Sequence, residues 1–398
     1  MTPPSSSEDA YQSTTPSIAS PYHPTLTRPS HHSSQTPPPS ILKPTTTTMP
    51  SNSTTTLPTT MRAWQYTTTS AGLENTMTLT TALPLPTPKP NEHLVRILTV
   101  SLNPLDYKAA EMPFFHRFLV PKPAIPGTDF CVRVVKPAAG SKVKEGELIY
   151  GVSSTQIFAG SALVEYAAVP VKSTVAVPEG VSTVEAAALP IAGLTGYQST
   201  IPYIKPGSRV FINGGSGGTV EFTIQIAKEA GAHVTTSCSS SNVELVRSLG
   251  ADEVVDYRSQ DVVTAIQKQA KEHGPFDLMV DNVGADHNLF FQLQDSLSSK
   301  GAYIMVAASP GSAFVGFTLR AKLLPGFLGG AKRKLVPFFG DCYQEEQYVQ
   351  LAQWVAEKKL RVLVDSTFAF EDAREAMRKM KSHRARGKII VDVAGKEA

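Results

Sequence analysis

The sequence predicts an α/β protein in which a disordered tail precedes a β-rich part and then a doubly wound parallel sheet. Three observations support this fold class. Residues 1–60 are rich in Ser, Thr and Pro, with few charged residues. Short strand patterns separated by Pro and Gly fill residues 61 to about 178. From about residue 183 onward, strand and helix patterns alternate, as in parallel sheets with helices on both faces.

The composition limits the kind of protein. A length of 398 residues allows about two domains and a tail. Hydrophobic residues make up 41% and charged residues 18%, which is typical of a soluble globular protein. The net charge of +3 is too small to indicate a nucleic-acid-binding protein. No apolar run approaches the roughly 20 residues that span a bilayer, and we expect 319–339 to be a folded segment with a basic turn.

The N-terminal tail and the cysteines provide evidence on the cellular compartment of the protein. Residues 1–60 cannot bury enough apolar area to offset their ordering entropy, so we expect them to be disordered. Alternatively, the gene prediction is over-extended, and the true start is at Met61. A mitochondrial transit peptide is the alternative, but only Arg28 and Lys43 are basic before Met61. The 3 cysteines are far apart and form no CxxC pair, which favours a reducing compartment and a cytoplasmic location.

The β-rich part has an alternating pattern in five short segments. Because many short strands with turn residues between them are typical of barrels, we expect a partly closed barrel. The expected strands are 61–66, 93–102, 130–135, 148–152 and 163–169.

The later part begins with a helix at 183–189, for which Ser182 is a candidate N-cap, and a second helix at 192–201. The strands expected after them are 210–213, 233–237, 253–256, 276–281 and 302–307. The helices expected between these strands end at Gly231 or span 243–249, 262–273 and 287–297. Helices at 344–359 and 371–381 and a strand at 388–393 close the chain.

A glycine cluster lies between the strand at 210–213 and the helix that follows it. Glycines let backbone N–H groups approach a phosphate, and the helix N-terminus adds its positive end. The alternative interpretation of the glycine cluster is a flexible Gly/Ser loop, but such a loop would not need to lie between a strand and a helix. We therefore expect a dinucleotide pyrophosphate to bind at Gly214, Gly215, Ser216, Gly217, Gly218 and Thr219.

Further candidates follow the next strand, because ligands of such sheets bind beyond the carboxyl ends of the strands. The polar residues there are Ser237, Ser239 and Asn242. An NAD site usually has an acidic residue here, whereas no acid precedes Glu244. Hydroxyl groups can donate to a 2′-phosphate, so we expect NADP(H), with Arg247 or Arg258 supplying charge. Helix capping is the alternative role of the serines.

The ends of the remaining strands supply the rest of the expected cofactor site. Tyr257 is placed to border the adenosine, although a surface aromatic is an equal alternative. Asn282 and Gly284 follow the fourth strand, where a glycine lets the backbone approach the nicotinamide ribose. Ala307 follows the fifth strand, where a small residue leaves room for the nicotinamide.

Several motifs together resemble the medium-chain dehydrogenase/reductase superfamily, in its zinc-independent quinone oxidoreductase-like and enoyl reductase branch. Besides the glycine turn, these motifs are residues 103–108, 126–130, 189–195, 250–257 and 384–389. The resemblance implies a GroES-like β-barrel catalytic domain at 61–185, a Rossmann domain at 186–340 and a segment at 341–398 that completes both, after a tail at 1–60.

The resemblance also implies roles for single residues. Asn103 and Thr195 would contact the nicotinamide or its ribose, and Lys388 would lie near the cofactor. Tyr107 is a candidate catalytic proton donor, which requires that its hydroxyl reach the substrate. The alternative is that Tyr107 only packs and water is the acid.

No metal site is expected. Zinc-dependent relatives use Cys, His and an acid, and a catalytic zinc needs at least three protein ligands. Here residues 103–108 replace the segment with the first cysteine ligand, and Asp106 and Asp129 alone are not a zinc site. Without a Lewis acid, alcohol oxidation is disfavoured, and reduction of a quinone or a conjugated C=C bond is favoured.

Two residues depart from the fingerprint. Val220 stands where Gly or Ala is usual and would cost about 1–3 kcal/mol if uncompensated. Glu221 follows it and would repel a pyrophosphate if it points at the turn.

Three hypotheses are therefore open. The first is an NADPH-dependent quinone or enone reductase that acts on free small molecules. Separately, the resemblance implies a homodimer, because members of this branch often form dimers. The second is an enoyl reductase that acts in trans on a substrate bound to a carrier protein or synthase, docking through basic residues at 332–334 or 381–386. The third is a scaffold whose cofactor affinity is weakened by Val220 and Glu221.

Overall fold

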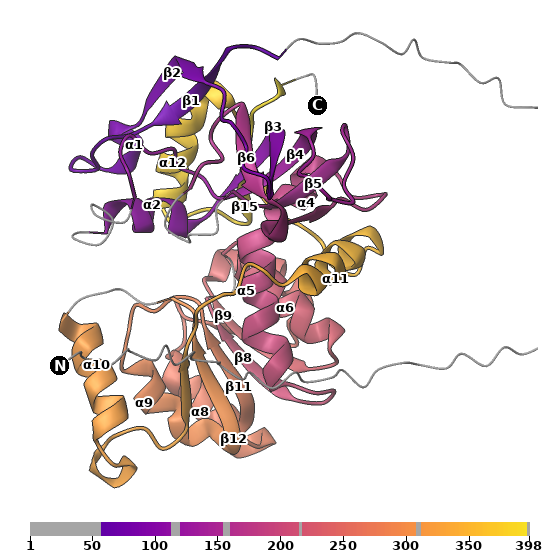
Figure 1. The fold of residues 1–398 in the computed structure, drawn as a ribbon. Coiled ribbons are helices and arrows are strands. Elements are labelled where there is room, and N and C mark those ends of the chain that lie inside the picture. The colour runs from indigo at the N-terminus through magenta and orange to yellow at the C-terminus, as the bar shows by residue number, and fades with distance from the viewer. Residues whose placement is uncertain (1–56, 113–119, 154–159, 215–216, 308–311, 396–398) are drawn as a thin grey trace, which may run out of the picture. The chain divides into compact units, whose positions relative to one another are not determined.

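Three sheets organise the computed structural model, which describes residues 57–112, 120–153, 160–214, 217–307 and 312–395 (Figure 1). The smallest sheet pairs β1 (Thr60–Gln65) with β2 (Thr78–Pro84) in antiparallel fashion. The other two are a seven-stranded mixed sheet and a six-stranded parallel sheet. The described residues from 57 onward belong to one compact unit.

The mixed sheet has the strand order β14-β15-β3-β4-β5-β7, and β6 also pairs with β3. Its strands are β3 (Glu92–Leu102), β4 (Asp129–Lys136), β5 (Leu148–Val152), β6 (Tyr166–Pro170), β7 (Thr174–Ala176), β14 (Val364–Ala369) and β15 (Lys388–Asp392). The helices near it are α1 (Leu73–Thr76), α2 (Pro104–Glu111), η1 (Val171–Ser173), η6 (Phe370–Asp372) and α12 (Ala373–Lys381). Because β15 runs antiparallel to β3, the C-terminal segment returns to the first half of the chain.

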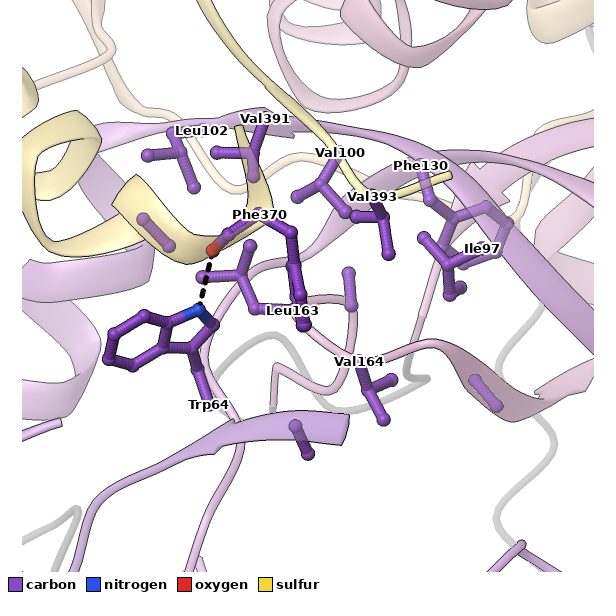
Figure 2. Packing of buried hydrophobic residues seen from close by; sticks show 14 of the residues in the cluster. Trp64, Ile97, Val100, Leu102, Phe130, Leu163, Val164, Phe370, Val391 and Val393 are labelled. Atoms are coloured by element: carbon purple, nitrogen blue, oxygen red, sulfur yellow. Dashed lines mark hydrogen bonds between the residues drawn. The ribbon is translucent and has the colours of Figure 1, made fainter. Parts of the chain in front are cut away.

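Figure 2 shows the core of this first half. Apolar side chains from β3, β4 and β15 pack with Phe370, and the Trp64 indole Nε1 donates a hydrogen bond of 2.7 Å to the Phe370 carbonyl oxygen. A buried indole with a satisfied N–H ties β1 to the C-terminal segment.

The parallel sheet has the order β10-β9-β8-β11-β12-β13. Its strands are β8 (Arg209–Asn213), β9 (His233–Cys238), β10 (Glu253–Asp256), β11 (Phe276–Asp281), β12 (Leu297–Met305) and β13 (Lys334–Pro337). The strand order changes direction between β8 and β11, and ligands of such sheets bind at that switch point, beyond the carboxyl ends.

Helices cover both faces of the parallel sheet. Val210 and Ile212 of β8 pack toward α6 (Val220–Glu229) and α7 (Val243–Ser248), whereas Phe211 packs toward α8 (Val262–His273), α9 (Leu289–Leu293) and α10 (Ser312–Leu323). The remaining helical elements are α4 (Thr183–Ala188), α5 (Pro190–Thr200), η2 (Ile201–Tyr203), η3 (Ser240–Asn242), η4 (Gln294–Ser296), η5 (Gly326–Leu328) and α11 (Glu345–Ala356). The predicted α/β fold class is confirmed, and Ser182 caps α4 as predicted.

The segment 319–339 is folded as expected and contains the end of α10, η5 and β13. Its basic turn is shorter than expected, because Lys334 is already a strand residue that pairs with Ala302. Other local features differ from expectation. The helix expected at 287–297 is shortened because η4 and β12 begin within it. Strand β14 was not expected, and its pairing with β15 defines it. Among the described residues, every helix is too short or too polar to cross a membrane.

Candidate functional site

The glycine turn after β8 has the backbone shape that a phosphate cradle needs. Gly214 has φ +97°, and a Cβ atom there would lie 2.7 Å from Val283 Cγ2, so only glycine fits. A Cβ at Gly217 would meet open space, which leaves room for a ligand. Thr219 is half-buried and precedes α6. Gly215 and Ser216 lie outside the described residues.

A hydrogen-bonded chain, here called the strand-end network, joins the carboxyl ends of four parallel strands. The Gly214 N–H donates to Ser237 Oγ (3.2 Å), and the Ser237 hydroxyl donates to Asn213 Oδ1 (2.6 Å). Asn213 Nδ2 donates to Asp281 Oδ1 (2.9 Å), and the Tyr303 hydroxyl donates to Asp281 Oδ2 (3.0 Å). The Ser237 hydroxyl therefore holds the turn in place.

Beyond β11 and β12, the other predicted residues surround the same edge of the sheet. The Gly284 N–H donates to the Asp281 carboxylate (3.2 Å) and the Ala307 N–H to the Asp281 carbonyl oxygen (3.2 Å). Both polar atoms of the Asn282 amide are buried and have no hydrogen-bond partner among the residues that the structure describes. Since buried amides are rarely left unpaired, Asn282 and the open turn fit a dinucleotide ligand.

The end of β9 supplies a second polar group. Asn242 Nδ2 donates to Ser239 Oγ (3.2 Å), and the buried Asn242 Oδ1 has no partner in the described part of the chain. Tyr257 directly follows β10 and is 49% exposed, which is compatible both with a residue that borders the adenosine and with a surface aromatic. Arg247 and Arg258 are also exposed near these strand ends.

A buried group of charged and polar side chains, here called the lysine cluster, lies beside the turn. It consists of Asn103, Asp106, Asp129, Glu221 and Lys388, all buried. Lys388 Nζ donates to Asn103 Oδ1 (2.6 Å) and lies 3.8 Å from Asp129 Oδ2. Asn103 Nδ2 donates to Asp129 Oδ2 (2.8 Å), and the Asn103 N–H donates to Asp106 Oδ2 (2.7 Å). Asn103 and Lys388, which the sequence assigned to the cofactor separately, are thus direct partners.

Local contacts explain how the cluster is placed. Asn103 precedes α2, and an acid at the third helical position is a usual partner for the N-cap backbone. Asp129 begins β4 and accepts a hydrogen bond from the Ile191 N–H (3.1 Å), near the start of α5. Thr195 is one turn further along α5 and half-buried, on the same side of the helix as Ile191.

The cluster also connects to the glycine turn. Gly217 forms a parallel backbone bridge with Gly387, the residue before Lys388. A Cβ atom at Gly218 would lie 3.0 Å from Lys388 Cδ, so the lysine stem passes close to the turn. The Lys388 charge therefore belongs to the same site as the predicted phosphate cradle.

Burial dominates the ionisation of the cluster. It raises the pKa of Asp106 to about 6 and the pKa of Asp129 to about 7, although their hydrogen bonds and Lys388 act in the opposite direction. Burial also lowers the pKa of Lys388, while the nearby carboxyl groups raise it. Three acids share one ammonium group, so the carboxyls are in excess.

The two departures from the fingerprint are both buried. Val220 packs in the sheet core with Ile212 and Ile224, which gives its extra methyl groups a place. Glu221 is 2% exposed, and neither carboxyl oxygen has a partner with normal hydrogen-bond geometry. Burial raises the pKa of Glu221 well above its usual range, opposed by Lys388, the backbone of Leu363 and the charge of Arg361.

Tyr107 occupies a different environment from the one expected for a free proton donor. Its ring packs in the β-rich core, and its hydroxyl oxygen lies 3.3 Å from Nε2 of His383. Burial raises its pKa, with Glu111 acting in the same direction and Lys381 against it. His383 is exposed, so it connects the Tyr107 hydroxyl to solvent.

The cluster does not fit a zinc ion. In the part of the chain that the structure describes, no three His, Cys, Asp or Glu side chains gather as a metal site. The carboxyl and amide oxygens of Asp129 and Asn103 already face the Lys388 ammonium group. Catalytic zinc needs about three protein ligands from nitrogen, sulfur or oxygen.

Sequence reasoning missed Asp129 and Asp281 as organising residues. The spacing of Asn103 and Asp106 was a readable N-cap signal, but nothing local links Asp129 to Lys388. Asp281 ends a strand, and its role depends on the neighbouring strands β8 and β12.

Comparison with known proteins agrees with this fold. Residues 89–179 match the alcohol dehydrogenase GroES-like domain, and residues 249–391 match a domain described as zinc-binding dehydrogenase. The chain belongs to the medium-chain dehydrogenase/reductase superfamily and is an oxidoreductase of its quinone oxidoreductase-like and enoyl reductase branch.

Particular relatives sharpen the class. The chain is 41% identical to the trans-enoyl reductase pgmF of Aspergillus terreus over 354 residues, covering 85% of this chain and 97% of that protein. It is 32% identical to the chloroplast envelope quinone oxidoreductase homolog of Arabidopsis thaliana, covering 83% and 98%. The solved quinone oxidoreductase of Coxiella burnetii superposes with a TM-score of 0.72 at 25% identity, covering 84% and 99%.

Proposed function

We propose that this protein is a zinc-independent reductase that uses NADPH to reduce a quinone or the conjugated C=C bond of an enone or enoyl compound. The observation that carries the proposal is the buried Lys388 ammonium group, held by Asn103 and Asp129 beside the glycine turn. This ammonium group supports a site in which an organic cation, and not a metal ion, supplies the positive charge beside the turn. Relatives named as a trans-enoyl reductase and a quinone oxidoreductase homolog support the same class.

The chain's own residues would bind the cofactor along the carboxyl edge of the parallel sheet. The turn at 214–218 with Thr219 would hold the pyrophosphate, and Asn282, Gly284 and Ala307 the nicotinamide ribose. When bound, NADPH supplies a hydride. Preference for NADPH over NADH is supported by Ser239 and Asn242, whose loop offers donors and no acid to a 2′-phosphate.

Residues of the β-rich half would stabilise negative charge and donate the proton during the reaction. The Lys388 ammonium group lies in a low-dielectric setting, where its charge stabilises an anion strongly. Tyr107 remains our candidate for the proton that completes the reduction, and exposed His383 would return a proton from solvent to the Tyr107 oxygen.

The test is NADPH oxidation by the full chain with a panel of quinones and enones, alongside NADH. We expect activity with NADPH that is much weaker with NADH. Tyr107→Phe should lower kcat, and His383→Ala should lower it as well, because it removes the group that links the Tyr107 hydroxyl to solvent. Absence of cofactor binding in the full chain would instead support the scaffold hypothesis.

A substrate bound to a carrier protein is the second candidate. One surface feature favours it, besides the trans-enoyl reductase relative. Val315, Leu319 and Leu323 of α10 and Phe327 of η5 are spaced by four residues and are 57%, 52%, 71% and 86% exposed. Such an apolar stripe fits a protein partner. Reduction of a carrier-linked enoyl thioester, but not of the free enone, would select this candidate.

We also propose a cytoplasmic location, because Cys131, Cys238 and Cys342 are free and only Cys342 is not buried. Imaging of the full chain with a C-terminal fluorescent protein tests it. A mitochondrial signal would overturn it and revive the transit peptide.

A further inference from the structure

Glu221 differs from the other acids of the lysine cluster in its surroundings. Asp106 accepts hydrogen bonds from Asn103 and Thr128, and Asp129 accepts them from Asn103 and Ile191. Both Glu221 oxygens are buried, and among the described residues neither has a donor in normal hydrogen-bond geometry. A buried carboxylate without donors is costly, so the neutral acid is favoured.

The charged groups around Glu221 cannot fully neutralise it. From β15 it faces Lys388, and from the segment before β14 it faces Arg361 and the Leu363 backbone. Lys388 is already committed to Asn103 and Asp129, with Asp106 also in its field. An ionised Glu221 would therefore compete with these groups for one ammonium.

The backbone around Glu221 is held firmly. One turn further along α6, Gln225 accepts a hydrogen bond from the Arg361 N–H (2.8 Å) and donates to the Arg361 carbonyl oxygen (2.9 Å). Glu221 and Gln225 lie on the same face of α6, so this face is closed over by the segment leading into β14. At 2% exposure, the Glu221 side chain is covered by this packing.

The position of Glu221 connects its charge state to cofactor binding. Glu221 lies in the first turn of α6, three residues after Gly218, and the Lys388 stem lies against Gly218. A pyrophosphate on the turn and a Glu221 carboxylate would both be anions acting on Lys388. Only a neutral Glu221 leaves the Lys388 charge to the phosphates.

We propose, as a consequence that rests on the function proposed above, that Glu221 is a positioning residue that stays protonated while the dinucleotide is bound. Binding of the cofactor is then linked to proton uptake at pH values where Glu221 is ionised in the free protein. The raised pKa of Glu221 is consistent with this linkage.

The experiment compares cofactor binding by the full chain and its Glu221→Gln variant across pH. Dissociation constants for NADPH and NADH come from fluorescence, and proton uptake comes from calorimetry in buffers of different ionisation enthalpy. Once Glu221 ionises, the wild-type affinity should fall about tenfold per pH unit relative to the variant, with up to one proton taken up. The same difference with NADH excludes the 2′-phosphate as its source.

The matched control is Glu229→Gln. It removes the same charge from α6, but at the exposed far end, where Glu229 pairs with Lys359. This control should follow the wild-type pH profile. Asp106 and Asp129 titrate in all three proteins, so the difference between profiles isolates Glu221.

Two results would overturn the inference: identical pH profiles and proton uptake for wild type and Glu221→Gln, or weaker binding by the variant at every pH. Glu221→Thr provides a second neutral variant if the glutamine protein does not fold. Failure of the proposed function has a different signature, namely normal NADPH binding by the wild type without reduction of any quinone, enone or enoyl substrate.

Discussion

The strand-end network and the lysine cluster are both buried and polar, but they differ in how completely their groups are paired. In the strand-end network, the side-chain polar atoms of Asn213, Ser237 and Asp281 all have partners. In the lysine cluster, three carboxyls face one ammonium, and neither Glu221 oxygen has a donor in normal hydrogen-bond geometry among the described residues. Complete pairing makes a polar network rigid, whereas incomplete pairing is a usual mark of a functional site.

This difference separates the two tasks of the site. The strand-end network holds the backbone turn, a task that needs no change of charge. The charged groups of the lysine cluster can change their pairing when an anionic ligand binds, because three carboxyls share one ammonium group. Substitutions in the strand-end network should therefore change stability and the shape of the turn. Substitutions in the lysine cluster should change stability, pH dependence and anion binding together.

The largest effect is expected from Lys388→Met. Removing the ammonium leaves Asp129 buried without its counterion, and the free energy of unfolding should fall by about 3–5 kcal/mol. Urea unfolding followed by circular dichroism measures it. The control, Lys359→Met, removes an exposed lysine paired with Glu229 and should change stability little. Equal losses in the two variants would mean that the cluster is not strongly coupled.

Gly214→Ala should have the next largest effect. The left-handed backbone alone costs a non-glycine residue about 1–2 kcal/mol. The added Cβ would also overlap Val283, so the turn should shift and NADPH binding should be lost. Gly140→Ala is the matched control, because Gly140 also has positive φ (+72°) but open space around it. If both variants lose the same stability and bind NADPH equally, the turn has no tight packing requirement.

Ser237→Ala tests the strand-end network itself. It leaves the Gly214 N–H and Asn213 Oδ1 without their partner, and we expect a loss of about 1–3 kcal/mol. NADPH affinity should also decrease, because the turn is no longer held. Thr236→Val removes a buried hydroxyl that bonds only the Ile212 carbonyl oxygen, so it should reduce stability with affinity unchanged. Unchanged affinity in both variants would contradict the holding role.

The smallest expected effect is a change in pH dependence in Asp129→Asn. The pKa of Asp129 is raised by burial from 3.8 to about 7 in the folded protein. The folded state therefore holds this proton more tightly, and the associated stability is present at low pH and lost as pH rises from about 4 to about 7. The urea concentration at the unfolding midpoint should therefore decrease with rising pH in the wild type over this range, and this decrease should be absent in Asp129→Asn.

Asp261 provides a contrast of opposite sign. Its pKa is lowered by hydrogen bonds from Thr264 at the start of α8, so its contribution is lost as pH falls. Asp261→Asn should therefore remove an upward slope at acidic pH. A downward slope that persists in Asp129→Asn would show that another group carries it.

Much of the fold was predictable because its elements have local signals. Strands β5, β10 and β11 and helix α8 have the bounds that their patterns predict. β13 and β14 were not predictable in this way. Their sequences become strands because β12 and β15 offer them backbone partners, and such pairing depends on residues far away in the chain.

The site divides in the same way. By itself, the sequence determined the glycine turn, the polar residues at the strand ends and the absence of an acid after β9, because each is a local pattern next to a strand or helix. Only the tertiary structure decided that Asn103, Asp129, Glu221 and Lys388 form one buried cluster. It also decided that the Glu221 oxygens lack a donor in normal geometry within the described part of the chain. The physical reason is that β15 must pair with β3, and Gly387 with Gly217, before these distant residues share one low-dielectric volume.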